Sequence, residues 1–329
     1  MPKARVAVTA GDPAGIGPEI ALRAALDESI ADIDVAVFGP RVHIERVRDR
    51  FSIPVEVVDW AAEPEGHRQG VLKVVDICRP ENCEISLGEV SRLGGEVALR
   101  SFEAAVHATR QGKFDAVCTG PWNKAAVQLT GARFSGHTEY LAHLMDVDPD
   151  AVSMMLVHDT LRVFHVSTHV RLREVVELAT SDRIQDVIAL ADGTLRRLGI
   201  ARPRIAVAAL NPHAGEDGLF GDEDLKQVTP AVAAAGAEGI DVQGPIPGDT
   251  VFVRALRGEF DGVVAMYHDQ GHIPIKVAGM GHAVNVTVGT PLIRTSVDHG
   301  TAMDIAAEGV AEPDSLVQAI AFAADMVAT

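Results

Sequence analysis

The stretch VAVTAGDPAGIGPE, residues 6–19, decides the fold of this 329-residue chain. Its first four residues are apolar or β-branched, as in a buried strand, and glycines and prolines then interrupt the run. Ile20, Leu22, Ala25 and Leu26 follow at a spacing typical of a helix. The stretch therefore predicts a strand, a glycine-rich turn and a helix. Because its glycine spacing is not the G-x-G-x-x-G of a Rossmann fold, the turn is expected either to pack closely or to meet a ligand.

Strand-like apolar runs alternate with helical patterns along the rest of the chain. This alternation predicts an α/β protein. Strands are expected at residues 35–39, 115–118, 205–210, 263–267 and 284–288, a hairpin at 154–166, and helices at 93–110, 170–179 and 183–198. Since no internal repeat and no obvious linker separates these segments, the domains are expected to interleave.

The composition limits the classes of protein. Hydrophobic residues make up 47% and aromatic residues 4% of the chain, which favours alternating strands and helices over an aromatic-rich β-sandwich. A formal net charge of −17 argues against nucleic-acid binding, so an anionic ligand would need cations concentrated at its site. We expect no membrane span and no signal peptide. With three cysteines (Cys78, Cys83 and Cys118) we also expect no disulfide framework, and these expectations together predict a cytoplasmic protein.

Three histidines, His169, His213 and His268, each lie at or just beyond the end of a strand-like run. Ligands of open α/β sheets bind at the carboxyl ends of the strands, and three imidazoles are a common ligand set for a catalytic metal. The separations of 44 and 55 residues are too long for one helix or hairpin, so only the fold can bring the three together. When each histidine is considered alone, a ring that donates a hydrogen bond to a backbone carbonyl in a loop is a simpler interpretation than a metal ligand.

A long loop follows the strand expected at 205–210. Its NPHAGE motif, residues 211–216, carries His213 and is expected to be functional, since loops at strand ends tend to carry sites. The acid-rich run behind it, residues 217–224, is expected to be a solvated face.

Other polar residues are candidates for ligand contacts. The GHTE motif at 136–139 precedes a helix, so it could hold an anion at the helix N-terminus, although Thr138 as a plain N-cap is favoured. Asp249, in a Gly/Pro turn, is a candidate N-cap or a residue that orients a ligand histidine. Lys276 and Arg294 are cations in apolar stretches, so each is expected to have an anionic partner, either an internal carboxylate or a substrate phosphate.

Six motifs together resemble a known family. In order and over nearly the whole chain, they resemble the PdxA family of 4-hydroxythreonine-4-phosphate dehydrogenases; the motifs lie at residues 11–20, 119–121, 136–139, 211–216, 267–271 and 298–302. The last motif is also similar to the adenosine-binding loop of isopropylmalate dehydrogenases. The resemblance implies the isocitrate/isopropylmalate dehydrogenase-like fold, with two interleaved α/β lobes and a cleft. The lobes are expected at 1–125 with 280–329, for the cofactor, and at 126–279, for metal, substrate and dimerisation.

The resemblance also implies roles for individual residues. His169, His213 and His268 match metal ligands, for one divalent ion per active site (Zn, Mg, Co or Mn). The implied substrate contacts are His137, Thr138, Lys276, Asn285 and Arg294. The implied cofactor contacts are Gly11, Asp12, His299, Gly300, Thr301 and Asp304, with NAD as the oxidant and NADP left open. Lys276 and Asp249 are the candidate catalytic residues, and a homodimer with its active site at the interface is expected.

The implied reaction oxidises 4-phosphooxy-L-threonine to 2-amino-3-oxo-4-phosphooxybutanoate. This β-keto acid loses CO₂ to give 3-amino-2-oxopropyl phosphate, in vitamin B6 synthesis. The sequence departs from the family pattern at two positions. The family usually has Leu where this chain has His272, and Gly where this chain has Ala307. Because His272 lies near the expected substrate pocket, the alternative is a paralogous dehydrogenase of 4-phospho-threonate, 4-phospho-erythronate or a related acid. We expect the B6 reaction ahead of it.

Two further classes compete with a dehydrogenase. A metal-dependent hydrolase would use the histidines to activate water without NAD, but in such an enzyme the loop at 299–305 would have no function. A non-catalytic anion-binding module would leave the three histidines unexplained.

Overall fold

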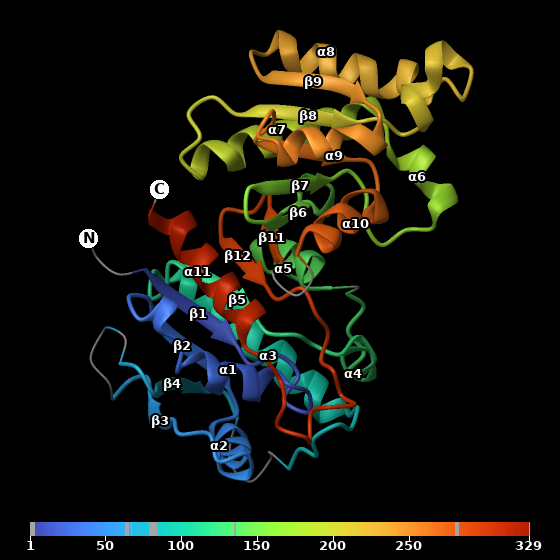
Figure 1. Cartoon of the computed structure of the whole chain (residues 1–329). Coiled ribbons are helices and arrows are strands. Elements are labelled where there is room, and N and C mark those ends of the chain that lie inside the picture. Colours follow the sequence, from blue (N-terminus) through green and yellow to red (C-terminus); the bar gives the residue numbers. More distant parts are fainter. Residues whose placement is uncertain are drawn as a thin grey trace. The chain divides into compact units, whose positions relative to one another are not determined.

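The chain divides into two compact units in the computed structural model (Figure 1). Unit 1 comprises residues 1–147 and 290–328, and unit 2 comprises residues 148–289. The structure describes residues 4–62, 66, 68–78, 84–134, 136–279 and 283–328. Both units combine a sheet with helices, so the predicted α/β class is confirmed.

Unit 1 contains six strands that pair in parallel throughout. In sheet order they are β3 (Glu56–Asp59), β4 (Val71–Asp76), β2 (Asp34–Gly39), β1 (Arg5–Thr9), β5 (Ala116–Thr119) and β12 (Ile293–Ser296). Val6, Ala7 and Val8 of β1 have no exposed surface, because a parallel sheet is covered on both faces. The continuous apolar run at the start of the chain is the direct consequence.

The helices of unit 1 supply that cover. They are α1 (Gly17–Ala24), α2 (Arg41–Arg50), α3 (Arg92–Arg110), α4 (Lys124–Leu129), α5 (His137–Met145) and α11 (Asp314–Ala328), with a short 3-10 helix at Glu28–Ile30. The strand, turn and helix predicted at the N-terminus are confirmed as β1, its loop and α1. Phe102 of α3 packs in one cluster with Val117, Trp122 and Tyr140.

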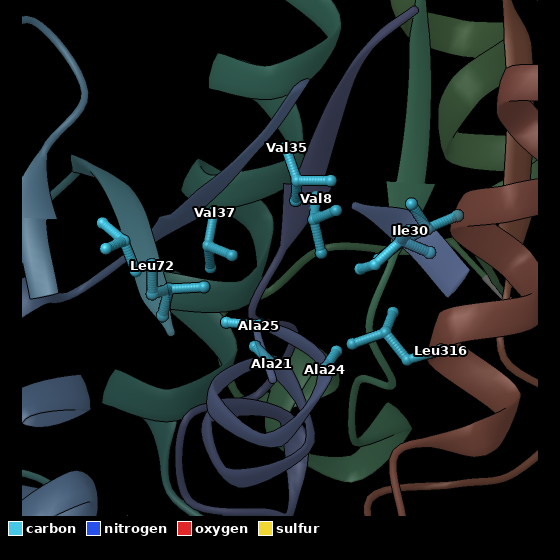
Figure 2. Close-up of a pocket in the computed structure, with 11 residues that line it drawn as sticks. Val8, Ala21, Ala24, Ala25, Ile30, Val35, Val37, Leu72 and Leu316 are labelled. Atoms are coloured by element: carbon cyan, nitrogen blue, oxygen red, sulfur yellow. The ribbon is translucent and has the colours of Figure 1, made fainter. Parts of the chain in front are cut away.

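A small gap lies between α1, α11 and the sheet of unit 1. Figure 2 shows Ala21 and Ala24 of α1, Ala25 just after its end, Leu316 of α11 and the valines of β1 and β2 around the gap. Its room of about 10 Å³ is close to the smallest that holds one water molecule. The lining side chains are all apolar, so this gap belongs to the core and offers a ligand no hydrogen bond.

Unit 2 also contains six strands, four of which run in parallel. Their order is β11 (Val284–Val288), β6 (Ser153–His158), β7 (Leu161–His165), β10 (Gly262–Ala265), β8 (Arg204–Ala208) and β9 (Asp241–Ile246). β6 is antiparallel to both β11 and β7, so the predicted hairpin is confirmed. β7, β10, β8 and β9 pair in parallel.

The helices of unit 2 connect these strands. They are α6 (Leu172–Leu178), α7 (Ser181–Arg197), α8 (Thr229–Ala237), α9 (Gly248–Leu256) and α10 (His268–Gly279). Shorter helical segments lie at Pro149–Ala151, Pro212–Gly218 and Asp224–Val228. α7 places Ile184, Val187 and Ile188 in the core with no exposed surface, which accounts for the apolar periodicity read there.

The borders of the units differ from the expected lobe borders at 125/126 and 279/280. Tyr140 and Leu141 of α5 pack in the Phe102 cluster of unit 1, so the first segment of unit 1 continues to residue 147. β11 pairs with β6, which keeps residues up to 289 in unit 2. Both differences arise from tertiary packing, which local sequence patterns do not report.

Two further expectations concern cysteines and membranes. Cys78 is disulfide-bonded, Cys118 is a buried free thiol, and Cys83 lies outside the described residues. The expectation was that a long chain with an odd number of cysteines has no disulfide framework, and a single bond at Cys78 is not such a framework. In the part of the chain that the structure describes, no helix is long and apolar enough to cross a membrane.

Candidate active site

The three candidate metal ligands follow neighbouring strands of unit 2. β7, β10 and β8 lie side by side and run in parallel, and His169, His268 and His213 follow their respective carboxyl ends. The prediction that the histidines follow strand ends is therefore confirmed. The sheet brings residues 44 and 55 positions apart in the sequence to one edge.

Two of these histidines lie close together. The ring centroids of His169 and His268 are 5.6 Å apart. Nδ1 of His268 lies 2.7 Å from a carboxylate oxygen of Asp269, which can only accept a hydrogen bond from an N–H, so Nε2 is left for a ligand. A carboxylate in this role is typical of histidines that bind metals.

The third histidine, His213, has Phe220 as a ring neighbour, with centroids 6.2 Å apart. Among the described residues of this chain, no three His, Cys, Asp or Glu side chains are grouped closely enough to hold a metal ion. The metal site of His169, His213 and His268 therefore stays a prediction. The second subunit of the expected homodimer would have to complete this site.

Two buried histidines, His165 and His272, lie next to His268. Their ring contacts were not predicted from the sequence. The rings of His268 and His272 stack at 3.6 Å, and His165 lies 4.8 Å from His272. Nδ1 of His165 donates to the Met154 carbonyl oxygen at 3.2 Å, and Nδ1 of His272 donates to that of His268 at 3.0 Å. Burial above all lowers the pKa of His165 to about 3 and that of His272 to about 4, so both rings are neutral at pH 7.

The spacing of α10 could have revealed this arrangement. His268, His272 and Lys276 are four residues apart, so they share one face of the helix. The charge of Lys276 contributes to the low pKa of His272, after burial and His268. A Cβ at Gly271 would come within 2.4 Å of His165 Nε2, so glycine is required for α10 to lie against β7.

A cavity of about 500 Å³ adjoins the ends of β8 and β10 in unit 2. Its lining includes His213, Asp249, Tyr267, Asp269 and Gln270. Gln270 ties the two strand ends together, because its Oε1 accepts from the Met266 amide at 2.7 Å and its Nε2 donates to the Ala209 carbonyl oxygen at 2.7 Å. The N-cap of α9 is Pro247, so the prediction that Asp249 caps this helix is wrong. Asp249 lies one residue inside α9.

The remaining substrate candidates of unit 2 are Lys276 and Asn285. Lys276 is exposed on α10. Asn285, on β11, donates from Nδ2 to the Met154 sulfur at 3.0 Å. Its buried Oδ1 has no hydrogen-bond partner within the described segments, so the amide retains capacity for a ligand.

Unit 1 provides a buried cation. Arg294 of β12 is 2% exposed, and its Nε and Nη2 donate to Thr119 Oγ1 at 3.1 and 2.5 Å. Burial lowers the pKa of Arg294 to about 10, so the guanidinium stays charged at pH 7. Burial, then the charges of Arg294 and Lys124, hold the pKa of His137 well below its usual value. His137 is therefore a neutral ring, stacked on Trp122 at 3.8 Å, beside a fixed positive charge.

The GHTE motif lies at the start of α5. Gly136 is the N-cap, so Thr138 lies in the first turn and the favoured prediction of Thr138 as N-cap is wrong. Glycine has no side chain with which to cap the helix amides. The positive end of the nine-residue α5 therefore adds to the potential around His137.

The candidate cofactor residues of the glycine-rich loop lie against the 299–304 segment. The Ile16 amide donates to the Thr301 carbonyl oxygen at 3.0 Å, and Gly15 packs on Thr301. Gly11 has φ +68°, and a Cβ there would lie 2.0 Å from the Pro121 carbonyl oxygen. The turn therefore packs closely, which was one of its two expected roles.

The side chains of these residues differ in exposure. Asp12 has no exposed surface, and its Oδ1 accepts from the Ala14 amide at 3.0 Å, so the carboxyl shapes the loop from inside. Burial raises the pKa of Asp12 to about 6. Gly300 and Asp304 are exposed, and a Cβ at Gly300 would meet no described atom within 4 Å. Nδ1 of His299 donates to the Gly300 carbonyl oxygen at 2.9 Å.

The acid-rich run 217–224 is only partly the solvated face that we expected. Asp217 and Asp222 are exposed, but Asp224 has no exposed surface. Its two carboxylate oxygens accept from the backbone amides of Leu210 and Asn211 at 2.7 and 2.9 Å. For Asp224 the expectation is wrong, because a run of acids does not reveal which member pairs with the backbone.

The fold and these residues define an α/β protein with a candidate site for an anionic small molecule. The chain belongs to the PdxA family: residues 31–323 match the family described as pyridoxal phosphate biosynthetic protein PdxA. The resemblance found in the six motifs is thereby confirmed.

Individual relatives extend this similarity over almost the whole chain. It is 45% identical to D-threonate 4-phosphate dehydrogenase of Cupriavidus necator, over 98% of this chain and 96% of that protein. It is 43% identical to 4-hydroxythreonine-4-phosphate dehydrogenase of Beijerinckia indica, over 97% and 94%. The crystal structure of 4-hydroxythreonine-4-phosphate dehydrogenase from Klebsiella pneumoniae matches with a TM-score of 0.90 at 41% identity, covering 99% of this chain and 100% of that one. The chain is therefore a dehydrogenase that acts on a CH–OH group.

Proposed function

We propose that this chain oxidises a 4-phosphorylated four-carbon hydroxy acid, with D-threonate 4-phosphate preferred and NAD as the oxidant. The observation that carries the proposal is the buried Arg294, because a desolvated guanidinium in an acidic chain suits a phosphate group. The similarity to the Cupriavidus dehydrogenase supports the choice of acid.

The phosphate is proposed to bind Arg294, His137 and Thr138. Arg294 supplies a charged N–H donor, and the first turn of α5 supplies the positive end of a helix dipole. Because His137 is neutral, it binds as a hydrogen-bond donor and adds no second charge. Lys276 and Asn285 are the proposed contacts of the carboxylate end.

Lys276 is proposed to favour a hydroxyl over an ammonium group at C2 of the acid. It lies on the same face of α10 as His272, whose ring is neutral and whose Nδ1 is committed to the His268 carbonyl oxygen. A positive charge at this face opposes an ammonium group by Coulomb repulsion, whereas a hydroxyl is unaffected. Threonate is therefore favoured over 4-hydroxythreonine.

A divalent metal and NAD are the proposed cofactors. The imidazoles of His169, His213 and His268 suit zinc and neighbouring ions, and the Asp269 contact orients His268 for such a role. A bound cation would lower the pKa of the substrate hydroxyl. The proposed NAD contacts are Gly11, His299, Gly300, Thr301 and Asp304, with Asp12 holding their loop in shape; NAD, when bound, accepts the hydride.

The chain's own residues then bind, orient and deprotonate the substrate. The C3 hydroxyl gives its proton to a base, for which Lys276 and Asp249 are the candidates, while hydride leaves C3. The ketone formed is β to the carboxylate, so CO₂ is lost and the enol takes up a proton to give 3-hydroxy-2-oxopropyl phosphate. Fixing the phosphate and the carboxylate aligns the C3–H bond for transfer.

A homodimer is part of the proposal. Of the fourteen large hydrophobic side chains that are exposed among the described residues, eleven lie in unit 2. They include Leu172 on α6 at 71% exposure and Val277 on α10 at 83%. Exposed apolar side chains gathered on one unit indicate a surface that a second copy covers.

A substrate panel tests the proposal. The chain is incubated with NAD, zinc or magnesium, and either D-threonate 4-phosphate or 4-hydroxythreonine 4-phosphate, and the absorbance of reduced nicotinamide is followed. We expect the higher kcat/KM with D-threonate 4-phosphate. Lys276→Met should move the ratio of the two kcat/KM values by about tenfold toward 4-hydroxythreonine 4-phosphate, an effect of about 1.4 kcal/mol, whatever rate both acids lose in common. The matched control is His272→Leu, which removes no charge from this face of α10.

Two outcomes would contradict the proposal. Metal-dependent turnover without reduced nicotinamide would favour a hydrolase, and tight binding of both acids without turnover would favour an anion-binding module. Preference for 4-hydroxythreonine 4-phosphate would instead support the second candidate, the B6 reaction, which the similarity to the Beijerinckia dehydrogenase favours.

A further inference from the structure

The loop that carries His213 has an unusual backbone. Five consecutive residues have positive φ: His213 at 54°, Ala214 at 55°, Gly215 at 78°, Glu216 at 44° and Asp217 at 53°. L-residues are disfavoured in this region because Cβ approaches the following carbonyl oxygen, and they adopt it mostly one at a time. We call residues 213–217 the left-handed turn. Such a run persists only where its surroundings hold it in place.

The surroundings of this turn are dominated by one buried carboxylate. Asp224 has no exposed surface, and its oxygens accept from the amides of Leu210 and Asn211 at 2.7 and 2.9 Å. These amides lie between the end of β8 and the left-handed turn. Two charge-assisted hydrogen bonds to a buried carboxylate fix the direction in which the chain enters the turn.

The left-handed turn also packs directly against the segment before Asp224. A Cβ at Gly215 would lie 2.9 Å from the Gly221 carbonyl oxygen and 3.8 Å from Asp224 Oδ2. The side chain of Asn211 donates to Glu223 Oε2 at 2.8 Å. Gly221, Glu223 and Asp224, which we call the clamp, therefore hold the turn from its inner side, while His213 lines the 500 Å³ cavity.

We propose that Asp224 is a positioning residue that holds the left-handed turn and so sets the place of the His213 imidazole on the cavity wall. The expected effect of Asp224 on metal binding rests on the proposed function, in which His213 is a metal ligand. The strain of the turn and the contacts of Asp224 do not depend on it.

The test compares Asp224→Asn with Asp222→Asn in the full-length chain. Asparagine keeps the size of the side chain but replaces one acceptor oxygen with an NH₂ group, which cannot accept from a backbone amide. Asp222 is exposed and pairs with Lys226, so it provides the same chemical change outside the clamp. Hydrogen–deuterium exchange of residues 210–218 and the zinc affinity by calorimetry are measured. Asp224→Asn should raise the exchange rate and weaken zinc binding at least tenfold each, and Asp222→Asn should change each less than twofold.

A rescue separates positioning from general stabilisation. Ala214→Gly removes the Cβ from a residue of the turn, so the turn should depend less on its clamp. In the Asp224→Asn background it should recover at least threefold of the lost zinc affinity. If Asp224→Asn does not fold, Ala214→Val, whose branched side chain opposes positive φ, should reproduce the tenfold loss with a native circular dichroism spectrum.

Three results would overturn the inference: unchanged exchange in Asp224→Asn, equal effects of the two acid variants on exchange, or full zinc affinity in Ala214→Val when His213→Ala has lost it. Zinc binding in His213→Ala as tight as in the wild type would count against His213 as a ligand, which belongs to the proposed function. The exchange rates would still decide on the clamp.

Discussion

At the scale of single residues, the candidate site depends on groups whose burial sets their charge. Arg294 keeps its charge in a buried position, while His137, His165 and His272 lose theirs. Desolvation opposes the charged form of all four side chains, but it cannot overcome the high intrinsic basicity of a guanidinium. In unit 1, Arg294 is therefore a fixed cation beside the neutral ring of His137.

The role of Arg294 is tested by Arg294→Lys. Lysine keeps the charge but loses the planar pair of donors, so the KM for the phosphorylated acid should rise about 10- to 100-fold, in keeping with about 1.5–3 kcal/mol for a charged hydrogen bond. The kcat should change only a few-fold. Arg100→Lys, on the exposed face of α3, is the control. An unchanged KM, measured by initial rates, would refute the assignment.

The burial of Asp12 predicts a pH dependence of stability. The pKa of its carboxyl is about 6 in the folded chain, against 3.8 in the unfolded chain, where the carboxyl is not buried. Between these values the folded state holds a proton that the unfolded state has lost, so stability falls as the pH rises from about 4 to about 6, by about 3 kcal/mol at 1.36 kcal/mol per pKa unit. Asp12→Asn should remove this contribution and be more stable than the wild type at pH 7.

Urea unfolding at pH 4.5 and pH 7 measures the difference. The difference in unfolding free energy between Asp12→Asn and the wild type should grow with pH, since asparagine keeps the Oδ1 that accepts from Ala14. A difference that is the same at both pH values would show that the carboxyl is not the group that titrates.

At the scale of elements, the β1 loop and α1 illustrate how close packing selects glycine. Gly11 and Gly112 have similar φ values, +68° and +73°, but different surroundings. A Cβ at Gly11 would overlap the Pro121 carbonyl oxygen at 2.0 Å, while one at Gly112 would meet no described atom within 4 Å. The two positions therefore separate backbone strain from steric overlap.

Gly11→Ala and Gly112→Ala form a matched pair. Gly112→Ala should cost about 1–2 kcal/mol of unfolding free energy, from positive φ alone. Gly11→Ala should cost about 3 kcal/mol or more, because overpacking against backbone adds to the strain. Chemical denaturation of both variants gives the comparison, and equal costs would contradict the close packing of this loop.

The elements also show how far the sequence could predict the fold and the site. Apolar periodicity located β1, α3, the β6–β7 hairpin and the strands that precede the three histidines, because burial imposes that periodicity. It could not locate the unit borders, which depend on how α5 and β11 pack. Apolar periodicity also could not distinguish the buried Asp224 from its exposed neighbours, and it could not predict the left-handed turn. Both features depend on hydrogen bonds between residues that are more than ten positions apart in the sequence. The roles of the predicted ligand, substrate and cofactor residues stay predictions.

At the scale of the whole molecule, the exposed apolar side chains of unit 2 predict self-association. Light scattering should give the mass of a dimer at micromolar concentration. Leu172→Glu should shift the chain toward the monomer, because it places a charge on the proposed contact surface. Leu129→Glu, at a residue of unit 1 that is 54% exposed, should leave the dimer intact. A monomeric wild type, or dissociation only in the Leu129 variant, would contradict this prediction.

The central claim is that this PdxA-family dehydrogenase oxidises a phosphorylated hydroxy acid at the carbon β to its carboxylate. The most direct measurement is the amount of reduced nicotinamide and of CO₂ formed from a limiting amount of D-threonate 4-phosphate, with NAD and zinc present. The account predicts one equivalent of each per substrate molecule. Consumption of the acid with neither reduced nicotinamide nor CO₂ would contradict it.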